Sequence, residues 1–288
     1  MYSKILVPLD GSQLAEQILP YVRLLAATGH IVVELIWVND LEVAGRPQGS
    51  GQEYLRQTIA RYLSALKQIE PIEADGKPAE LIVQRAATAP SCLIAMATHG
   101  MSGMRRWLIG SVASKVAQSA ENPLFLVRPS ENADPARAVE FNTMFVPLDG
   151  SGLAETALRF AVPLAKELKV AVQLLRVYSV PSQAYIVADG MIAQGSAQFR
   201  EVIHQEAESY LGAKVETLRA EGLDRVSGTA LQADPASEII DIAAKTTNSI
   251  IVMSTHGRSG MGRWLLGSVA EKVIQHSQAP VLLIRARR

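Results

Sequence analysis

Two copies of a glycine-rich block carry residue types that bind phosphate. Residues 98–116 read THGMSGMRRWLIGSVASKV, and residues 255–273 read THGRSGMGRWLLGSVAEKV. In each block a Gly-Ser pair opens a predicted helix, and free N–H groups at a helix start bind anions without a basic side chain. Gly100 and Gly257 follow a predicted strand, where the missing Cβ lets the backbone approach a ligand closely. The alternative is structural, with the glycines in turns and the serines as helix N-caps.

A second repeated motif, Pro-Leu-Asp-Gly-Ser, occupies residues 8–12 and 147–151. Asp10 and Asp149 are expected at the carboxyl end of the first strand of each copy. A carboxylate there accepts hydrogen bonds from a base amino group or a ribose hydroxyl. An aspartate before glycine also forms an Asx turn or caps the next helix. The residues alone leave both interpretations open.

The two motifs occur in the same order twice, which indicates an internal duplication. The second copy has 18 more residues between the motifs, and we expect most of them in the polar stretch 179–198. The stretch 130–140 is polar and contains proline, as linkers do. The predicted organisation is therefore a domain over residues 1–129, a linker over 130–140 and a second domain over 141–288.

Short apolar runs alternate with amphipathic stretches in both copies, which predicts parallel strands joined by helical crossovers. The fold class expected is α/β, with two tandem domains, each an open five-stranded parallel sheet with helices on both faces, Rossmann-like and adenine nucleotide alpha hydrolase-like. Ligands bind such sheets at the carboxyl ends of the strands. The helices predicted in the first copy include 52–69, 78–87 and 110–119. The predicted strands are Ile5–Leu9, Ile31–Val38, Pro71–Ala74, Cys92–Ala97, Leu124–Val127, Met144–Leu148, Val170–Val177, Val226–Leu231, Ile250–Ser254 and Val281–Ile284.

Composition narrows the function classes. The chain has 288 residues, with 28 Lys and Arg balancing 28 Asp and Glu, so a dedicated nucleic-acid binder is not expected. The single cysteine, Cys92, lies in an apolar run and is interpreted as a buried structural thiol. Neither a membrane span nor a signal peptide is apparent, and no metal site is predicted. The expectation is a soluble cytoplasmic protein.

Other candidate side chains lie in the glycine-rich blocks. Arg106 and Arg263 recur, and each either reaches outer phosphates or remains a solvated side chain packed on tryptophan. His99 and His256 have no acid at a spacing that indicates a catalytic triad, so we interpret them as residues that shape the loop. The P-loop, dinucleotide-binding and hydrolase-elbow motifs are missing from the sequence.

With both motifs present in both halves, the chain resembles a tandem universal stress protein built from two UspA-type domains. It is similar to the ATP-binding branch of that family, whose loop reads Gly-x2-Gly-x9-Gly-Ser/Thr. The resemblance implies ATP or AMP as ligand, with Mg²⁺ held by the phosphates as an option, and no catalytic residue. One departure is that the first loop glycine is Ala97 in copy one and Ser254 in copy two.

Carried over by motif, the family site implies nine nucleotide-binding positions in each copy. In the first copy they are Pro8, Leu9, Asp10, Val38, Ala97, Gly100, Gly110, Ser111 and Val112. In the second copy they are Pro147, Leu148, Asp149, Val177, Ser254, Gly257, Gly267, Ser268 and Val269.

Three functions are compatible with these residues. The first is a nucleotide-binding stress-response module that acts through ligand-dependent association with an unidentified protein partner. The second is a dimerisation and interaction scaffold without nucleotide, and the third is a slow ATPase, with weak hydrolysis at most. The apolar last strands, 124–127 and 281–284, are expected to pair with each other about a pseudo-two-fold axis. A homodimer of the whole chain is a further expectation.

Overall fold

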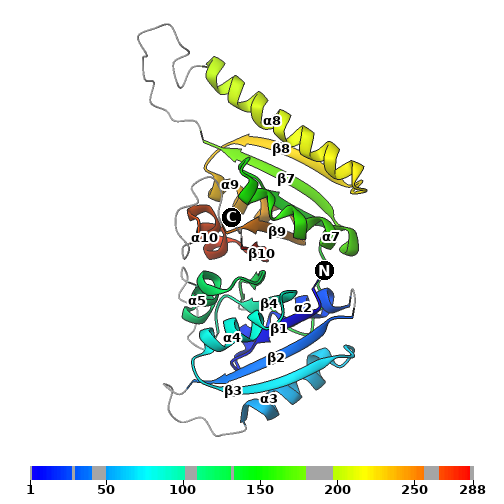
Figure 1. Ribbon diagram of the computed structural model, residues 1–288, viewed down its shortest axis with the longest axis vertical. Helices are drawn as coiled ribbons and strands as arrows, with labels where there is room; N and C mark the ends of the chain where they lie inside the picture. Colours follow the sequence, from blue (N-terminus) through cyan, green and yellow to red (C-terminus); the bar gives the residue numbers. More distant parts are fainter. Residues whose placement is uncertain are drawn as a thin grey trace.

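The computed structural model describes residues 2–27, 30–40, 50–100, 109–130, 133–179, 197–255 and 266–285. Ten strands form one sheet, in the order β3-β2-β1-β4-β5-β10-β9-β6-β7-β8 (Figure 1). The strands of the first copy are β1 (Lys4–Pro8), β2 (Val32–Asn39), β3 (Ile69–Asp75), β4 (Cys92–Ala97) and β5 (Leu124–Val127). Those of the second are β6 (Thr143–Pro147), β7 (Ala171–Tyr178), β8 (Val226–Gln232), β9 (Ser249–Ser254) and β10 (Val281–Ile284).

Helices cover both faces of this sheet. The first copy has α1 (Gln13–Glu16), α2 (Leu19–Ala26), α3 (Ser50–Thr58), a π-helical segment (Ile59–Leu63), α4 (Pro78–Ala87) and α5 (Ser111–Ser119). The second has α6 (Gly152–Glu155), α7 (Leu158–Leu168), α8 (Ala197–Ala220), α9 (Pro235–Lys245) and α10 (Ser268–His276). One core cluster lies under α1 to α3 and α6 to α8, and the other lies under α4, α5, α9 and α10. Each cluster contains residues of both copies, so each core layer continues from one copy into the other.

Within each copy the strands are parallel, whereas the last strands of the two copies pair antiparallel, Val281 opposite Leu126 and Leu283 opposite Leu124. This is the pairing that the apolar last strands predict. Arg128 donates from Nη1 to the carbonyl of Gln275 at 2.5 Å, and Arg285 donates reciprocally to the carbonyl of Gln118 at 2.7 Å. Because the two halves run in opposite directions, their strand carboxyl ends lie at opposite edges of the sheet.

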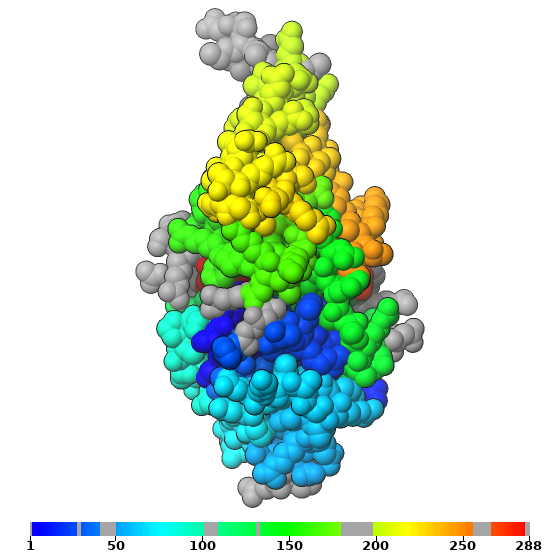
Figure 2. Space-filling view, turned by 90° about the vertical axis from the view of Figure 1, so that its right-hand side faces the viewer, coloured from blue at the N-terminus to red at the C-terminus, as the bar shows by residue number. Residues whose placement is uncertain are grey.

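The molecule is elongated along the sheet, with α8 at one end and α3 at the other (Figures 1 and 2). Helix α8 has 24 residues, whereas α3 has nine and the following π-helical segment has five. Helix α8 is thus ten residues longer than its counterpart, and only Ala197 and Gln198 of it fall in the stretch 179–198 where the extra length was expected. Residues 180–196 lie outside the described part of the chain.

The prediction of one helix over 52–69 is wrong at its end. The helical segment stops at Leu63, where the Leu66 N–H donates to the Leu63 carbonyl at 2.9 Å. Ile69 instead begins β3, opposite Val33 of β2. The end of the helix is decided by the pairing of β3 with β2. The spacing of apolar residues along the helix does not reveal where that pairing begins. The other strands match their predicted ranges to within about two residues, the uncertainty inherent in assigning element ends.

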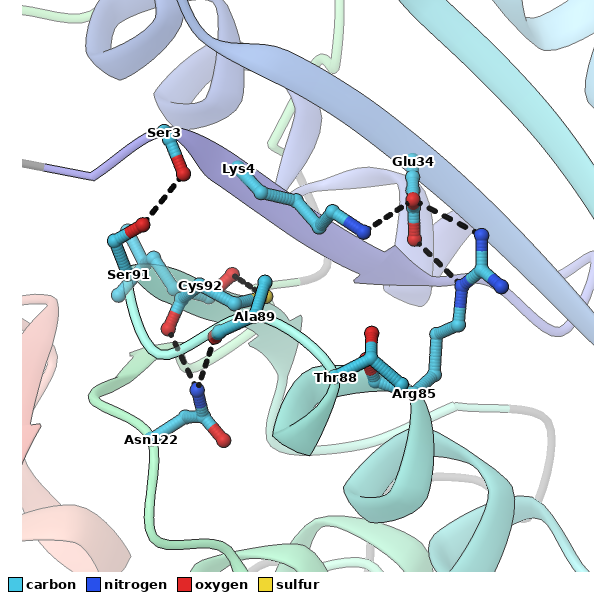
Figure 3. A network of polar contacts seen from close by, with 10 residues as sticks. Ser3, Lys4, Glu34, Arg85, Thr88, Ala89, Ser91, Cys92 and Asn122 are labelled. Carbon is cyan, nitrogen blue, oxygen red and sulfur yellow. Dashed lines mark hydrogen bonds and ion pairs between the residues drawn. The ribbon is translucent and has the colours of Figure 1, made fainter.

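A polar network lies at the amino end of β1 (Figure 3). Glu34 is only 2% exposed, and it accepts from Lys4 Nζ at 2.5 Å and from Arg85 Nε at 2.9 Å. Burial, the largest single influence, acts to raise the pKa of Glu34, but the hydrogen bonds and charges of Arg85 and Lys4 together lower it below its ordinary value. The counterpart of Glu34 in copy two is Gln173, opposite Phe145, so this ion pair belongs to the first copy alone.

The segment between the two copies packs against the first copy. The side-chain amide of Gln17 makes two 2.8 Å hydrogen bonds with the backbone of Ser130. Arg23 donates to the carbonyls of Pro135, Ala136 and Arg137 at 2.8–3.1 Å. These contacts satisfy backbone groups of residues 130 and 135–137, none of which lies in a helix or strand.

Candidate functional site

The Asp-Gly-Ser motifs form equivalent turns at the carboxyl ends of β1 and β6. Asp10 Oδ1 accepts from the N–H of Ser12 at 3.0 Å and from its hydroxyl at 2.6 Å. Asp149 does the same with Ser151, at 2.9 and 2.6 Å. The glycine between them has a φ of +86° at Gly11 and +84° at the equivalent position, which a side chain would strain. The Asx-turn interpretation is therefore confirmed for one carboxylate oxygen of each aspartate.

The second oxygen of Asp10 faces the end of β4. A Cβ on Gly100 would overlap Asp10 Oδ2, so the loop after β4 passes against this carboxylate only because residue 100 is glycine. The structure thus brings the two sequence motifs of copy one into contact. Gly257, the matching glycine of copy two, lies outside the described residues.

Helices α5 and α10 begin beside these turns. The N–H of Gly110 donates to the carbonyl of Thr98 at 2.8 Å, and Gly267 bonds Thr255 in the same way at 2.8 Å. Neither glycine supplies a side-chain acceptor, whereas Ser12 and Ser151 cap α1 and α6 through their hydroxyls. The first N–H groups of α5 and α10 are thus left without a side-chain cap, and they carry the positive end of the helix dipole.

A cavity of about 320 Å³ lies between these elements in copy one, and one of about 270 Å³ in copy two. Both volumes are near the lower end of the range for small-molecule sites. All nine positions predicted for copy one line the first cavity. In copy two the second cavity is lined by eight of the nine, namely Pro147, Leu148, Asp149, Val177, Ser254, Gly267, Ser268 and Val269. Arg106 and Arg263 lie outside the described residues.

Several lining residues were not predicted from sequence. Helices α4 and α9 contribute Pro78 and Ile82 to the first cavity and Pro235 and Ile239 to the second. The repeated Pro-Ala at the start of both helices was an available signal. Asp40 also lines the first cavity.

His99 was expected to shape the loop, and it lines the cavity of copy one. Met96 lines the same cavity and is buried in the core cluster under α4 and α5. The Nδ1 of His99 lies 3.0 Å from the hydroxyl of Thr98, so the ring contacts the side chain of the preceding residue. His256 is outside the described part of the chain.

A tyrosine and a glutamate lie behind each Asp-Gly-Ser turn. Tyr54 of α3 donates to Glu16 Oε1 at 2.9 Å, and Tyr210 of α8 donates to Glu155 Oε1 at 2.9 Å. Burial, followed by the neighbouring carboxylate, raises the pKa of both tyrosines above the ordinary value, so they stay neutral donors. These pairs fasten α3 and α8 to the short helices that follow the turns.

No group of three or more His, Cys, Asp or Glu side chains within the described ranges is arranged to hold a metal ion. Among the same residues, none of the helices combines the length and apolar character needed to cross a membrane.

Both copies match known proteins. The Universal stress protein family profile matches residues 1–128 and again residues 140–285. Universal stress protein MJ0531 of Methanocaldococcus jannaschii is 33% identical over 146 residues, covering 50% of this chain and 82% of that protein. Universal stress protein YxiE of Bacillus subtilis is 31% identical over 160 residues, covering 50% of this chain and 99% of that protein.

A solved structure shows the same tandem fold. The crystal structure of a universal stress protein from Archaeoglobus fulgidus aligns with a TM-score of 0.67 over 98% of this chain and 96% of that chain, at 20% identity. The likeness covers the full length, so it includes the joining of two copies. The two profile matches establish that this chain belongs to the universal stress protein family.

Proposed function

We propose that each copy binds an adenine nucleotide in the cavity at the carboxyl ends of its strands. The observation that carries the proposal is the pair of uncapped helix starts, at α5 and α10, that line the two cavities. Helix N-termini of this kind accept phosphate. The resemblance to the ATP-binding branch of the family supports the same ligand.

The residues divide into two sides of the proposed ligand. Asp10 and Val38 in copy one, with Asp149 and Val177 in copy two, would hold the adenine and ribose. The Gly-Ser starts of α5 and α10 would hold the phosphates, and Mg²⁺ would be held by phosphate oxygens and water. The start of α5 packs closely on the end of β4, because a Cβ on Gly110 would lie 3.0 Å from the Thr98 carbonyl oxygen.

We also propose that the bound nucleotide regulates association with a protein partner. Binding stabilises whichever state of the protein holds the ligand, so a nucleotide can shift an association equilibrium. The units proposed for this function are residues 1–129 and 141–288, joined by the linker 130–140. Gln17 and Arg23 hold the intervening segment against the first unit.

The test is binding by the purified full chain. We expect ATP or AMP at millimolar concentration to raise the melting temperature, and mass spectrometry to find adenine nucleotide released on denaturation. Gly110→Val and Gly267→Val should each remove one site, because a branched side chain fills the space at the helix start. The double variant should bind none.

Loss of binding must be separated from loss of folding. Circular dichroism of each unliganded variant supplies that control, since a folded variant that does not bind isolates the site. Absence of any nucleotide effect on the wild-type chain would contradict the proposal and leave the interaction scaffold as the function. Unchanged affinity in the folded double variant would refute the phosphate assignment.

A further inference from the structure

The two outermost strands of the sheet, β3 and β8, each pair with a neighbour on one side only (Figure 1). Pro71 of β3 is opposite Leu35. Gly228 of β8 is opposite Leu174, which holds the place in β7 that Leu35 holds in β2. The two edges can therefore be compared position by position. An open edge is a template for pairing with another strand unless the chain blocks it.

The edge of β3 is blocked. The N–H of Val33 donates to the Gln68 carbonyl, so the residues of β3 that bond β2 are 70, 72 and 74, and residue 71 faces outward. Proline at that position has no N–H to offer a further strand. Three carboxylates also lie on this strand, at Glu70, Glu73 and Asp75. Proline and charged side chains are devices by which edge strands avoid pairing.

The edge of β8 carries none of these devices. The residues that replace Glu70, Pro71, Glu73 and Asp75 are Ser227, Gly228, Ala230 and Gln232. The other three of the seven positions are uncharged in both strands. Charges resume only outside β8, at Asp224 and Arg225 before it and at Asp234 after it. Residues 226–232 thus form an uncharged edge, where the first copy has an acidic edge that contains proline.

The backbone of β8 directs hydrogen-bonding groups away from the sheet. The N–H of Val172 donates to the Arg225 carbonyl, so residues 227, 229 and 231 bond β7, whereas residues 226, 228, 230 and 232 face outward. The Val226 carbonyl accepts from Arg219 Nη2 at 3.3 Å. The outward backbone groups at 228, 230 and 232 have no hydrogen-bond partner in the part of the chain that the structure describes. These groups are available to a further strand.

Gly228 shows that this edge is open to solvent. Helix α8 covers one face of the residue, because a Cβ there would lie 3.0 Å from the Leu211 Cβ. Gly228 is exposed nonetheless. Since glycine has no side chain, the exposed surface is its backbone. The close packing of α8 explains why this position is glycine, but it does not cover the edge.

We propose that β8 pairs antiparallel with β8 of a second copy of this chain, about a two-fold axis. Such an axis places the strand opposite itself, and an uncharged strand then meets no like charge. The chain already joins its two halves in this way, since the uncharged strands β5 and β10 are equivalent and pair antiparallel. A second copy supplies a strand of matching chemistry, and the sheet continues from one chain into the next. The proposal does not depend on nucleotide binding.

Sedimentation equilibrium of the full-length chain tests the proposal. We expect the mass to rise from that of one chain to that of two as the protein concentration increases. Ser227→Glu with Gln232→Asp restores two of the β3 carboxylates at exposed positions of β8. Each added charge enters the paired strands twice, so the dissociation constant of the dimer should rise by roughly tenfold or more.

The matched control is Ser64→Asp with Gln68→Glu, which adds the same two charges at exposed positions of the first copy, before β3. This control should leave the dissociation constant of the dimer unchanged. Circular dichroism of both double variants verifies that they are folded, so that a loss of dimer reports on the edge itself.

Hydrogen exchange followed by NMR supplies a test on the wild-type chain. The amides of Gly228 and Ala230 should exchange more slowly as protein concentration rises, because they donate to the second chain. The outward amides of β3, at Glu73 and Asp75, should show no such dependence. A single-chain mass at every concentration, or a dimer that persists unchanged in the folded Ser227→Glu/Gln232→Asp variant, would overturn the proposal.

Discussion

The carboxylate of Asp10 occupies the space that a Cβ atom on Gly100 would need. One residue ends the first strand and its turn, and the other follows the fourth strand. The contact joins the two segments across the point where the strand order of the sheet reverses, since β1 lies between β2 and β4. Two motifs that lie about ninety residues apart in the chain thereby form one wall.

Replacing Gly100 with alanine should disturb that wall. The added methyl group must displace either the carboxylate or the loop, so we expect weaker nucleotide binding at copy one and a loss of roughly 1–3 kcal/mol in unfolding free energy. Calorimetric titration of the Gly267→Val chain, with and without Gly100→Ala, measures the binding effect.

Gly152→Ala is the matched control for that experiment. Gly152 lies at the first position of α6, next to the equivalent turn of copy two, and an added Cβ there meets no atom within 4 Å. It should leave binding at copy one unchanged. Equal affinities in the Gly100→Ala and Gly152→Ala chains would show that the contact does not shape the site.

A stabilising substitution is expected at Gly212. This residue lies inside α8, is exposed, and has no atom within 4 Å of an added Cβ. Alanine there lowers the backbone entropy of the unfolded chain, so unfolding free energy should rise by about 0.5–1 kcal/mol. Denaturant unfolding monitored by far-ultraviolet circular dichroism tests this, and a decrease would mean that α8 is not helical at this position.

The Glu34 ion pair should make stability depend on pH. Its pKa in the folded chain is lowered below the ordinary value of 4.5, so its stabilising contribution is present above that value and is lost as pH falls through the folded value. Arg85→Met should destabilise the chain by roughly 1–3 kcal/mol at neutral pH, because it leaves a buried carboxylate with Lys4 as its remaining ion-pair partner among the described residues.

The difference between wild type and Arg85→Met should shrink as pH falls below the ordinary value of 4.5 and through the lowered pKa of Glu34 in the folded chain. Denaturant unfolding at several pH values measures it. The double variant Arg85→Met/Glu34→Leu should recover stability relative to the single variant, because no carboxylate stays buried at position 34. A difference that is constant across pH would exclude the ion pair as its cause.

Cys92 should be inert in the folded chain. The thiol is fully buried at the start of β4, and burial raises its pKa to about 11, so the reactive thiolate is scarce at neutral pH. Reaction with a thiol reagent should proceed at the rate of unfolding, and become rapid in denaturant. Rapid labelling of the native protein would show instead that the segment around β4 opens locally.

Much of the fold follows from patterns that the sequence displays. The strand Cys92–Ala97, the helix Pro78–Ala87 and the last strands were predicted with the bounds that the structure has. Each is an apolar run or an amphipathic period bounded by proline, glycine or polar residues, so local chemistry decides its limits. The repeated motifs and the family resemblance predicted nine residues that line the first cavity and eight that line the second, but not those contributed by α4 and α9.

The side chains that lie under the two Asp-Gly-Ser turns, Trp37 under Gly11 and Arg176 under Gly150, were not predicted from the sequence. Both are internal residues of strands whose apolar sequences predict burial. The periodicity of a strand does not reveal which of its side chains will lie under a turn that follows another strand. Tyr54 and Glu16 are far apart in the chain, and their hydrogen bond depends on where α3 packs. The arginines at the seam did leave a signal, because one follows each last strand at equivalent positions.

The joining of the copies through one chain has a consequence for how the protein can change over time. When two identical subunits form a symmetric dimer, any mutation appears in both halves at once. Here a mutation alters one half only, while the linker keeps the partner half present at high effective concentration however dilute the protein is. Trp37 and Arg176 are an example, because these equivalent buried positions of the two copies hold an uncharged and a positively charged side chain.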